Sequence, residues 1–466
     1  MDYHEFLLAK QQLRRTDGIA VDDLPDYLFG FQRVLVEWAL QQSRCAIFAD
    51  CGLGKTPMQL VWADIVAKHT GKPTLILTPL AVSGQTLREA NKFGVDAMGS
   101  RDGTHSGCGV VVTNYERLHY FEPDQFGGVV CDESSAIKAF EGKRRKQVTR
   151  FLAKKKFRLM CTATAAPNDF IELGTHSEAL GELTQSDMLQ TFFKSSDNAR
   201  HSLFKEGDFW NRAKYFFRAH AEQPFWRWVC SWARAVRTPS DLGFDDDGFI
   251  LPPLNVQQYT LPSTFCWPGE LFPRIAGTLR EQRVERRMTM QERCDKVGEL
   301  VDHDEPAVVW CQYNDEGDIL EKMIPGSVQV AGRHSDDEKE DKLKAFTFGE
   351  VRVLITKPKI GAWGLNWQHC GHHTFFPSHS FEQYYQAVRR SLRFGRVGPV
   401  RVDIVTTEGE EGVTENLTAK QLKADEMFRR LVEEMNRGKS ITIEDLHTKP
   451  SGVPDWLQPK ELTECR

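Results

Sequence analysis

A glycine-rich segment near the N-terminus has the residue types that bind a phosphate chain. The segment ADCGLGKT, residues 49–56, follows the apolar run CAIF and precedes a helix-like stretch. At such a strand–loop–helix junction, backbone N–H groups and the positive end of the helix dipole attract phosphate oxygens. Lys55 would reach the β- and γ-phosphates of a nucleotide, and the Thr56 hydroxyl would bind Mg²⁺. A plain glycine turn would explain the glycines, whereas a P-loop also explains the Gly-Lys-Thr. The residues expected to contact the nucleotide here are Gly52, Leu53, Gly54, Lys55 and Thr56.

Two acidic residues follow another apolar run, in GGVVCDESS. Asp132 would hold Mg²⁺ through a water molecule, and Glu133 would polarise the water that attacks the γ-phosphate. An acidic cap on the next helix would explain one carboxylate at this position but not two. The pair therefore complements the glycine-rich loop.

The segment SFEQYYQAVRRSLRFGR, residues 380–396, is predicted to form an amphipathic helix. Gln386, Arg390 and Arg393 are spaced at i, i+4 and i+7, so they would share one helix face. Arginines that enter a nucleotide site from a second lobe stabilise the transition state, an effect of about 10³–10⁵ in rate. A solvated basic face is the alternative meaning of this spacing.

Periodicity places these motifs in two α/β lobes, because short β-rich runs alternate with helix-like segments over residues 45–180 and again over 306–408. Apolar strands that alternate with helices are typical of a parallel sheet covered on both faces. The segment between the lobes is helical and aromatic, and we expect an insertion and connector rather than a third sheet. Its Trp-rich part, residues 209–232, favours helical core packing over stacking platforms for bases. The predicted strands are CAIFAD, TLILTP, GVVVTNY, GGVVCDES and FRLMCTAT in the first lobe, and AVVWCQY, SVQVAG, VRVLITKP, HTFFPS and VRVDIVTTEG in the second.

Length, charge and cysteine usage limit the class of protein. A chain of 466 residues suits two or three domains. The formal net charge of -5 gives no global basic field, so a nucleic acid would be bound by a local cleft. The eleven cysteines are scattered without a CxxC pair, which suits reduced thiols. Because no apolar run could span a bilayer and the N-terminus does not have the pattern of a secretion signal, we expect a cytoplasmic protein with no membrane partner.

A series of motifs over about residues 28–408 resembles that of superfamily 2 helicases, and most closely the Swi/Snf-type double-stranded DNA translocases. The resemblance implies two RecA-like parallel-sheet lobes with a helical insertion between them, and the binding of ATP, Mg²⁺ and nucleic acid. The first-lobe motifs are LFGFQRVLVEWAL, ADCGLGKT, TPLAVSGQ, TNYERL, CDESSAIK and CTATAAPNDFIEL, and the second-lobe motifs are WCQYNDEGDILEKM, GAWGLNW and QAVRRSLRFGR.

The resemblance assigns roles to further residues. Gln32 in the opening motif would read the adenine base, and Gly364 in GAWGLNW would contact the nucleotide. Thr162, Ala163 and Thr164 would couple hydrolysis to lobe movement. The residues expected at the nucleic acid or in coupling are Pro79, Thr113, Thr162, Thr164, Gln312 and Asn366. The expected catalytic residues are Lys55, Asp132, Glu133, Gln386, Arg390 and Arg393, and the expected metal ligands are Thr56 and Asp132.

Three departures from the family pattern concern the coupling of hydrolysis to movement. The acidic box reads Asp-Glu-Ser-Ser where the family usually has Asp-Glu-Ala-His. KPKI precedes GAWGLNW where Ser-Thr-Arg-Ala is common, and Arg389 replaces the usual aspartate of the last motif. We expect the hydrolysis chemistry to survive these changes, and we expect any effect of them to fall on the stepping machinery.

The predicted organisation is an N-terminal segment 1–27, an ATP-binding lobe 28–180, a helical insertion and connector 181–304, a C-terminal lobe 305–410, and a C-terminal helix and tail 411–466. The resemblance implies an ATP hydrolase, a compact prokaryotic or phage-type motor that moves along double-stranded DNA. Two alternatives are a helicase that separates DNA or RNA strands and a module that uses ATP as a clamp to assemble a replication or defence complex.

Two basic runs and one Cys-His cluster are open to weaker interpretations. The runs KRRK, residues 143–146, and KKKFR, residues 154–158, are expected to be solvated helix faces, with phosphate contacts as the alternative. Cys370, His372 and His373 lie in or beside a predicted core strand, without a second pair of ligands, so metal binding is not favoured.

Overall fold

The computed structural model describes residues 17–79, 82–138, 142–166, 169–195, 215–218, 220–262, 278–361, 366–376, 378 and 380–437. These residues form two compact units. The first contains the described residues up to Asp246 and those from Lys423 onward, and the second extends from Asp247 to Leu422.

The first unit is built on a seven-stranded sheet with the order β3-β4-β2-β5-β6-β1-β9, in which every pairing is parallel. The central strands are apolar and buried along their whole length, as expected of a sheet covered on both faces. The strands are β1 Arg44–Ala49, β2 Thr74–Thr78, β3 Ala97–Gly99, β4 Val110–Asn114, β5 Gly128–Asp132, β6 Phe157–Thr162 and β9 Ala233–Val236. A separate antiparallel pair joins β7 Phe193–Ser195 and β8 Tyr215–Phe217.

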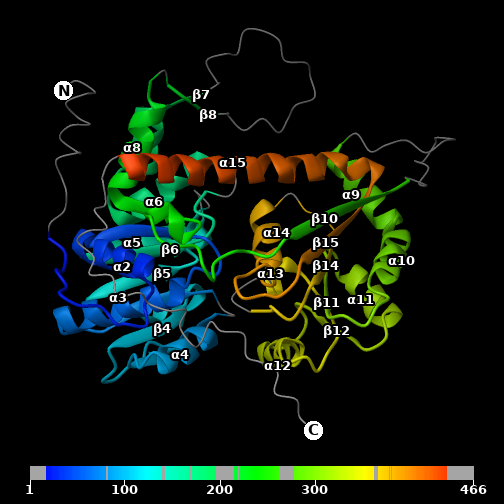
Figure 1. The fold of residues 1–466 in the computed structure, drawn as a ribbon, viewed down its shortest axis with the longest axis horizontal. Coiled ribbons are helices and arrows are strands. Elements are labelled where there is room, and N and C mark those ends of the chain that lie inside the picture. The colour runs from blue at the N-terminus through cyan, green and yellow to red at the C-terminus, as the bar shows by residue number, and fades with distance from the viewer. Residues whose placement is uncertain are drawn as a thin grey trace. The chain divides into compact units, whose positions relative to one another are not determined.

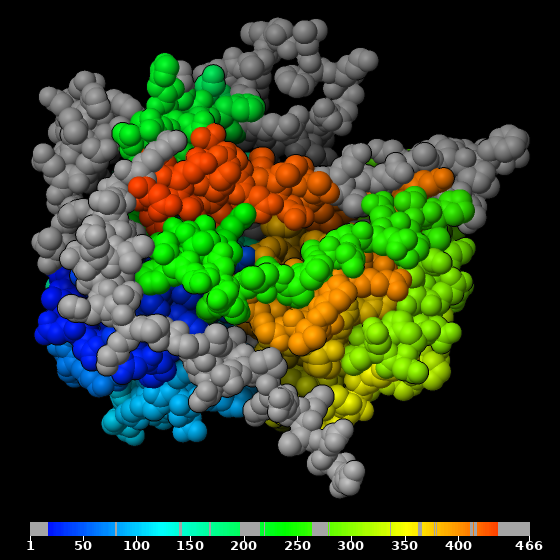
Figure 2. All heavy atoms as spheres, in the orientation of Figure 1, coloured from blue at the N-terminus to red at the C-terminus, as the bar shows by residue number. Residues whose placement is uncertain are grey.

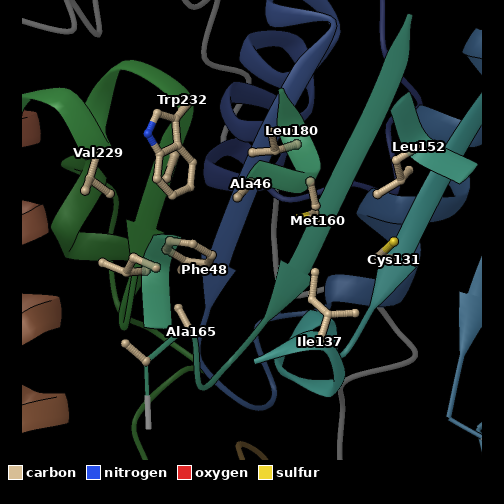
Figure 3. Packing of buried hydrophobic residues seen from close by; sticks show 14 of the residues in the cluster. Ala46, Phe48, Cys131, Ile137, Leu152, Met160, Ala165, Leu180, Val229 and Trp232 are labelled. Atoms are coloured by element: carbon tan, nitrogen blue, oxygen red, sulfur yellow. The ribbon is translucent and has the colours of Figure 1, made fainter. Parts of the chain in front are cut away.

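Helices cover both faces of this sheet (Figure 1). The core of one face includes residues of α5, α6 and α8. Phe48 of β1 lies among Ala165, Val229 and Trp232, and its ring meets that of Trp232 edge-on at 6.2 Å between centroids (Figure 3). The helices are α2 Gly30–Gln42, α3 Lys55–Thr70, α4 Ser83–Lys92, α5 Lys143–Ala153, α6 Leu173–Leu180, α7 Gln185–Phe192 and α8 Glu222–Trp232.

The second unit has a six-stranded parallel sheet with the order β10-β15-β14-β11-β13-β12. Its edge strand β10 has mostly exposed side chains, and Figure 2 shows this segment in green at the surface. The strands are β10 Leu254–Leu261, β11 Ala307–Trp310, β12 Ser327–Val330, β13 Val353–Thr356, β14 His372–Phe375 and β15 Val400–Thr407.

Two apolar clusters lie on opposite faces of the second sheet. One contains residues of α12 and α14, and the other contains residues of α10 and α11. A capping box starts α12, since the Ser335 hydroxyl accepts from the Glu338 N–H and the Glu338 carboxylate accepts from the Ser335 N–H. The helices are α9 Leu279–Met288, α10 Met290–Leu300, α11 Asn314–Met323, α12 Asp336–Thr347, α13 Pro358–Gly361, α14 Phe381–Val388 and α15 Glu411–Arg437.

The predicted fold class is confirmed: both units are α/β, with parallel sheets whose strands include every predicted apolar run. The predicted domain boundaries stay predictions. The segment 181–304 differs in detail, because besides helices it contains the β7–β8 pair and supplies β9 and β10 to the edges of the two main sheets. The run ARAV directly follows α8 and forms the strand β9 because it pairs with β1.

The Trp-rich segment packs as core where it is described, so stacking platforms are not formed there. Trp226, Trp228 and Trp232 of α8 are buried. They lie in the cluster that also includes Phe428 and Leu431 of α15. Residues 209–214 lie outside the described part of the chain.

The expectation that both basic runs form solvated helix faces is wrong for three of their residues. Arg145 is buried and pairs with Glu178 at 3.0 Å. Lys155 is buried, and its ammonium donates to backbone carbonyls, including that of Phe126 at 2.9 Å, which offsets the cost of burying the charge. Arg158 lies in β6 and donates to the carbonyl of Ala179 at 3.0 Å. These cations satisfy carbonyls and a carboxylate inside the unit, so they are structural.

His372 and His373 both lie in β14, as expected of a core strand. His373 accepts from the indole N–H of Trp310 at 3.0 Å, and the His372 ring lies 2.9 Å from an Asp403 oxygen. Among the residues that the structure describes, no three His, Cys, Asp or Glu side chains are grouped to hold a metal ion. No described helix combines the length and apolar character needed to span a lipid bilayer.

Candidate functional site in the first unit

Three of the predicted motifs follow neighbouring strands and therefore meet at one edge of the first sheet. The glycine-rich loop follows β1, the threonine motif follows β6, and the acidic pair follows β5. These strands are adjacent in the order β5-β6-β1 and parallel, so their carboxyl ends lie at the same edge. Ligands of open parallel sheets bind at this edge.

Two left-handed glycines shape the loop after β1. Gly52 has φ +93° and Gly54 has φ +72°, a conformation that side chains with a Cβ rarely adopt. Gln32 of α2 lies against this turn, since its Nε2 donates to the Leu53 carbonyl at 2.8 Å while its Oε1 accepts from the Phe29 N–H at 3.1 Å. A Cβ on Gly54 would lie 2.3 Å from that Nε2. Gln32 therefore holds α2 against the glycine-rich loop. Its recognition of adenine stays a prediction.

Lys55 is the first residue of α3, and Thr56 is the second. The Lys55 ammonium donates to the carbonyls of Ala49 at 3.0 Å and Asp50 at 3.3 Å, so it lies folded over the loop. A cation at this position adds its charge to the positive end of the α3 dipole. The loop thus gathers positive electrostatic potential where a phosphate group would bind.

Asp132 and Glu133 at the end of β5 are both buried. Burial raises the pKa of Asp132 to about 6, with a further contribution from Glu133, while the hydrogen bond from Gln59 and the charge of Lys55 oppose the rise. The Glu133 backbone is left-handed, with φ 47° and ψ 54°. Thr162 Oγ1 donates to Glu133 Oε2 at 3.3 Å, which ties the end of β6 to the acidic pair.

Sequence reasoning missed three residues around the acidic pair. Gln59 of α3 donates to Asp132 Oδ1 at 2.7 Å, and the Tyr115 hydroxyl donates to the Asp132 carbonyl at 2.7 Å. The imidazole of His176 in α6 lies 3.0 Å from Ser134 Oγ, and burial lowers the pKa of His176 to about 4. The sequence does show a glutamine among apolar residues one turn after Lys55, and this could have indicated Gln59. Nothing in the sequence pairs Ser134 with a histidine 42 positions away.

The residues at this edge fit an Mg²⁺–nucleotide. The left-handed Gly52 and Gly54 carry no Cβ that could block the approach of a phosphate to the loop backbone, and Lys55 begins the helix that follows. Asp132 offers the hard oxygen that Mg²⁺ prefers, and its carboxylate lies in a buried setting where a cation would favour the charged form. A nucleotide bound with Mg²⁺ would supply the phosphate that is transferred to water.

The first-unit residues predicted at nucleic acid have different surroundings. Thr113 is buried, and its hydroxyl donates to the Ser100 carbonyl at 2.8 Å. Thr162, Ala163 and Thr164 are also buried, and the Thr164 N–H donates to Thr162 Oγ1 at 3.0 Å. Pro79 directly follows β2 at the same edge of the sheet. The nucleic-acid and coupling roles of these residues stay predictions.

In the second unit, Gln312 follows β11 and is held in place by its neighbours. Its N–H donates to Glu316 Oε2 at 2.7 Å and its side chain donates to the Phe376 carbonyl at 3.1 Å. Glu316 also pairs with Arg293 at 3.1 Å, and both side chains are fully buried. Asn366 is exposed, and Gly364 lies outside the described residues.

The prediction of one helix over residues 380–396 is wrong, because α14 ends at Val388. The Arg390 N–H bonds to the Ala387 carbonyl, and its Nε donates to the Gln386 carbonyl at 3.0 Å. In a continuing helix the Gln386 carbonyl would accept the Arg390 N–H. Here the Arg390 side chain occupies that carbonyl instead, so the helical hydrogen-bond pattern stops. Gln386 and Arg390 are buried, Arg393 lies past the helix end, and the three do not share a helix face.

Fold and site together define a two-unit α/β protein whose first unit has a glycine-rich loop and a buried acidic pair at one edge of its parallel sheet. No family model matches the chain. Protein p41 of Acyrthosiphon pisum secondary endosymbiont phage 1 is 23% identical over 425 residues, which cover 80% of this chain and 88% of that protein. Among solved structures, the Sulfolobus solfataricus SWI2/SNF2 ATPase core in complex with double-stranded DNA is similar over 92% of this chain and 100% of its own, with 16% identity and a TM-score of 0.40.

Proposed function

We propose that this chain is a nucleic-acid-dependent ATPase that moves along double-stranded DNA. The observation that carries the proposal is the edge of the first sheet, where Lys55 begins α3 beneath a left-handed glycine loop and the strand two positions away ends in Asp132 and Glu133. The order of motifs in the sequence, which resembles the Swi/Snf-type translocases, supports the choice of duplex DNA.

In this proposal the residues of the first unit have distinct tasks. Lys55 and the loop amides bind the β- and γ-phosphates, Thr56 and Asp132 hold Mg²⁺, and Glu133 orients and deprotonates the attacking water. Thr162, which is hydrogen-bonded to Glu133, would sense the state of that carboxylate. A change at Glu133 would then reach the segment after β6.

Arg390 and Arg393 of the second unit would stabilise charge on the phosphates. Arg390 is buried and occupied with the Gln386 carbonyl, whereas Arg393 is half-buried beyond the end of α14. We therefore assign the main charge-stabilising role to Arg393. Arg393→Ala should retain ATP binding and lower turnover by at least about 10²-fold, whereas equal losses in binding and rate would make it structural.

Lys55→Ala tests the nucleotide site itself. Turnover should be abolished with the fold intact, because the change removes a phosphate contact and no apolar packing from the core. Lys68→Ala is the matched control, since Lys68 is an exposed lysine of the same helix that pairs with Asp64 on the surface. Turnover near that of the wild type in Lys55→Ala would end the P-loop interpretation.

The choice among functions rests on the nucleic acid that stimulates hydrolysis. ATPase activity should rise more with duplex DNA than with single-stranded DNA or RNA of equal length, and should fall steeply with salt because contacts to phosphates dominate. The protein should displace the third strand of a triplex in an ATP-dependent reaction and leave a forked duplex annealed. An unwound fork with an intact triplex would support the strand-separating helicase, and nucleotide-dependent DNA binding without turnover would support the clamp.

A further inference from the structure

Gln59 is a polar residue on a buried stretch of α3. Its neighbours Met58, Leu60, Val61 and Trp62 are buried apolar residues, and Gln59 itself is only 1% exposed. Burying an amide costs free energy unless its polar atoms are hydrogen-bonded. A glutamine at this position therefore needs a specific partner.

That partner is the carboxylate of Asp132. Gln59 Nε2 donates to Asp132 Oδ1 at 2.7 Å, across 73 residues of sequence, and links α3 to the end of β5. The Asp132 carbonyl is held separately by the Tyr115 hydroxyl at 2.7 Å. The Asp132 carboxylate thus accepts from Gln59 and from the Glu133 N–H, while the Tyr115 hydroxyl holds its carbonyl, so the carboxylate has a fixed orientation.

We propose that Gln59 is a positioning residue for Mg²⁺, which deepens the proposed function and rests on it. By taking Oδ1, Gln59 leaves Oδ2 of Asp132 for the hydration shell of the cation. Groups that hydrogen-bond a metal-binding carboxylate from behind fix its orientation, and their removal typically lowers metal affinity or activity about 10–100-fold.

The position of Gln59 on α3 also connects two parts of the site. Lys55, Thr56 and Gln59 lie within the first two turns of the same helix. Because a helix is rigid over this length, the donor that orients Asp132 keeps a constant relation to the Thr56 hydroxyl. The two predicted Mg²⁺ contacts, Thr56 on α3 and Asp132 at the end of β5, are thereby held in register.

The test replaces the donor and measures the metal directly. Gln59→Met keeps the length of the side chain and removes the donor, and Gln59→Asn withdraws the amide by one methylene. Gln41→Leu is the control, because Gln41 donates to Glu37 in the same kind of amide–carboxylate bond on the exposed surface of α2. Mn²⁺ binding in the presence of ADP is measured by electron paramagnetic resonance, and the Mg²⁺ dependence of ATP hydrolysis is measured alongside.

Both Gln59 variants should weaken Mn²⁺ binding about 10-fold and raise the half-saturating Mg²⁺ concentration by the same factor, while hydrolysis recovers at high Mg²⁺. Gln41→Leu should match the wild type. In an Asp132→Asn background, Gln59→Met should weaken Mn²⁺ binding no further, since Gln59 acts through Asp132. Should Gln59→Met fail to fold, Gln59→Asn decides.

Unchanged Mn²⁺ affinity in folded Gln59 variants would overturn the proposal and make Gln59 a structural residue. An equal further loss in the Asp132→Asn background would also overturn it. A wild-type protein that binds no Mn²⁺–ADP would instead refute the proposed function, so the two failures are distinguishable.

Discussion

Alanine at Gly54 should disturb the glycine-rich loop far more than alanine at Gly71. The two glycines lie at opposite ends of α3 and have similar φ angles, +72° and +65°. A Cβ at Gly54 would lie 2.3 Å from Gln32 Nε2, whereas a Cβ at Gly71 would have nothing within 4 Å. Gly71→Ala therefore isolates the backbone cost, and Gly54→Ala adds the collision with Gln32.

The expected magnitudes follow from these surroundings. A left-handed backbone costs a residue with a Cβ about 1–2 kcal/mol, and this applies at both positions. At Gly54 the Gln32 amide must also move, and its 2.8 Å bond to the Leu53 carbonyl is worth about 1 kcal/mol. We expect Gly71→Ala to lower the free energy of unfolding by about 1.5 kcal/mol and Gly54→Ala to lower it by about 2.5 kcal/mol.

Urea titration of each variant, followed by tryptophan fluorescence and far-ultraviolet circular dichroism, measures both losses. Adding Gln32→Ala to Gly54→Ala removes the colliding amide, so the double variant should be less destabilised than the sum of the two single variants. Equal losses at Gly54 and Gly71 would refute the contact between Gln32 and the loop. ATP binding should weaken in Gly54→Ala and stay unchanged in Gly71→Ala.

Three further predictions concern buried charges and protons. His176 and His373 have pKa values lowered by burial to about 4 and about 3. Both histidines are neutral in the folded state and titrate near pH 6.5 when unfolded. The folded state is therefore fully stable with respect to these groups above pH 6.5, and it loses stability as the pH falls toward 4, by about 3 kcal/mol for His176 alone. Unfolding free energies measured from pH 7.5 to 4.5 should fall accordingly, and His176→Gln should flatten the profile; an unchanged slope would contradict the assignment. His373→Gln should flatten the pH dependence of the unfolding free energy of the second unit, where the Trp310 indole needs an unprotonated acceptor. Arg293→Met should destabilise the protein by about 3–5 kcal/mol because it leaves the buried Glu316 charge without a cation, with only backbone N–H groups bonded to it among the described residues. Adding Glu316→Gln should recover part of that loss in urea titrations, and a purely additive double variant would contradict the pairing.

Strands were predictable from the sequence where apolar residues run continuously. The run TLILT of β2 and the run VLIT of β13 are buried throughout, so their composition identifies them. The strand β10 carries polar residues on both faces, and what makes LNVQQYTL a strand is its pairing with β15, which no local pattern reveals. The end of α14 escaped prediction for a similar reason, because the side chain of Arg390 competes for a backbone acceptor.

The candidate site was predictable to the extent that its residues belong to motifs. Lys55 and Asp132 follow strands that their flanking apolar residues identify, and the parallel order brings them to one edge. Their supports come from elsewhere, as Gln59 does for Asp132 and His176 does for Ser134. These two hydrogen bonds join residues 73 and 42 positions apart, so they depend on tertiary packing, and no local pattern in the sequence reveals the pairing.

The left-handed backbone at Glu133 creates a trade-off between thermal stability and the proposed activity. Glycine at this position would relieve a strain of about 1–2 kcal/mol while deleting the carboxylate that we assign to the attacking water. A laboratory selection for survival at high temperature, applied without a demand for turnover, would therefore favour Glu133→Gly and yield a sturdier, inert protein. A screen that seeks a stabilised form of this protein has to keep position 133 fixed and look for its gains at a glycine such as Gly332, where the backbone is not left-handed and a Cβ would meet open space.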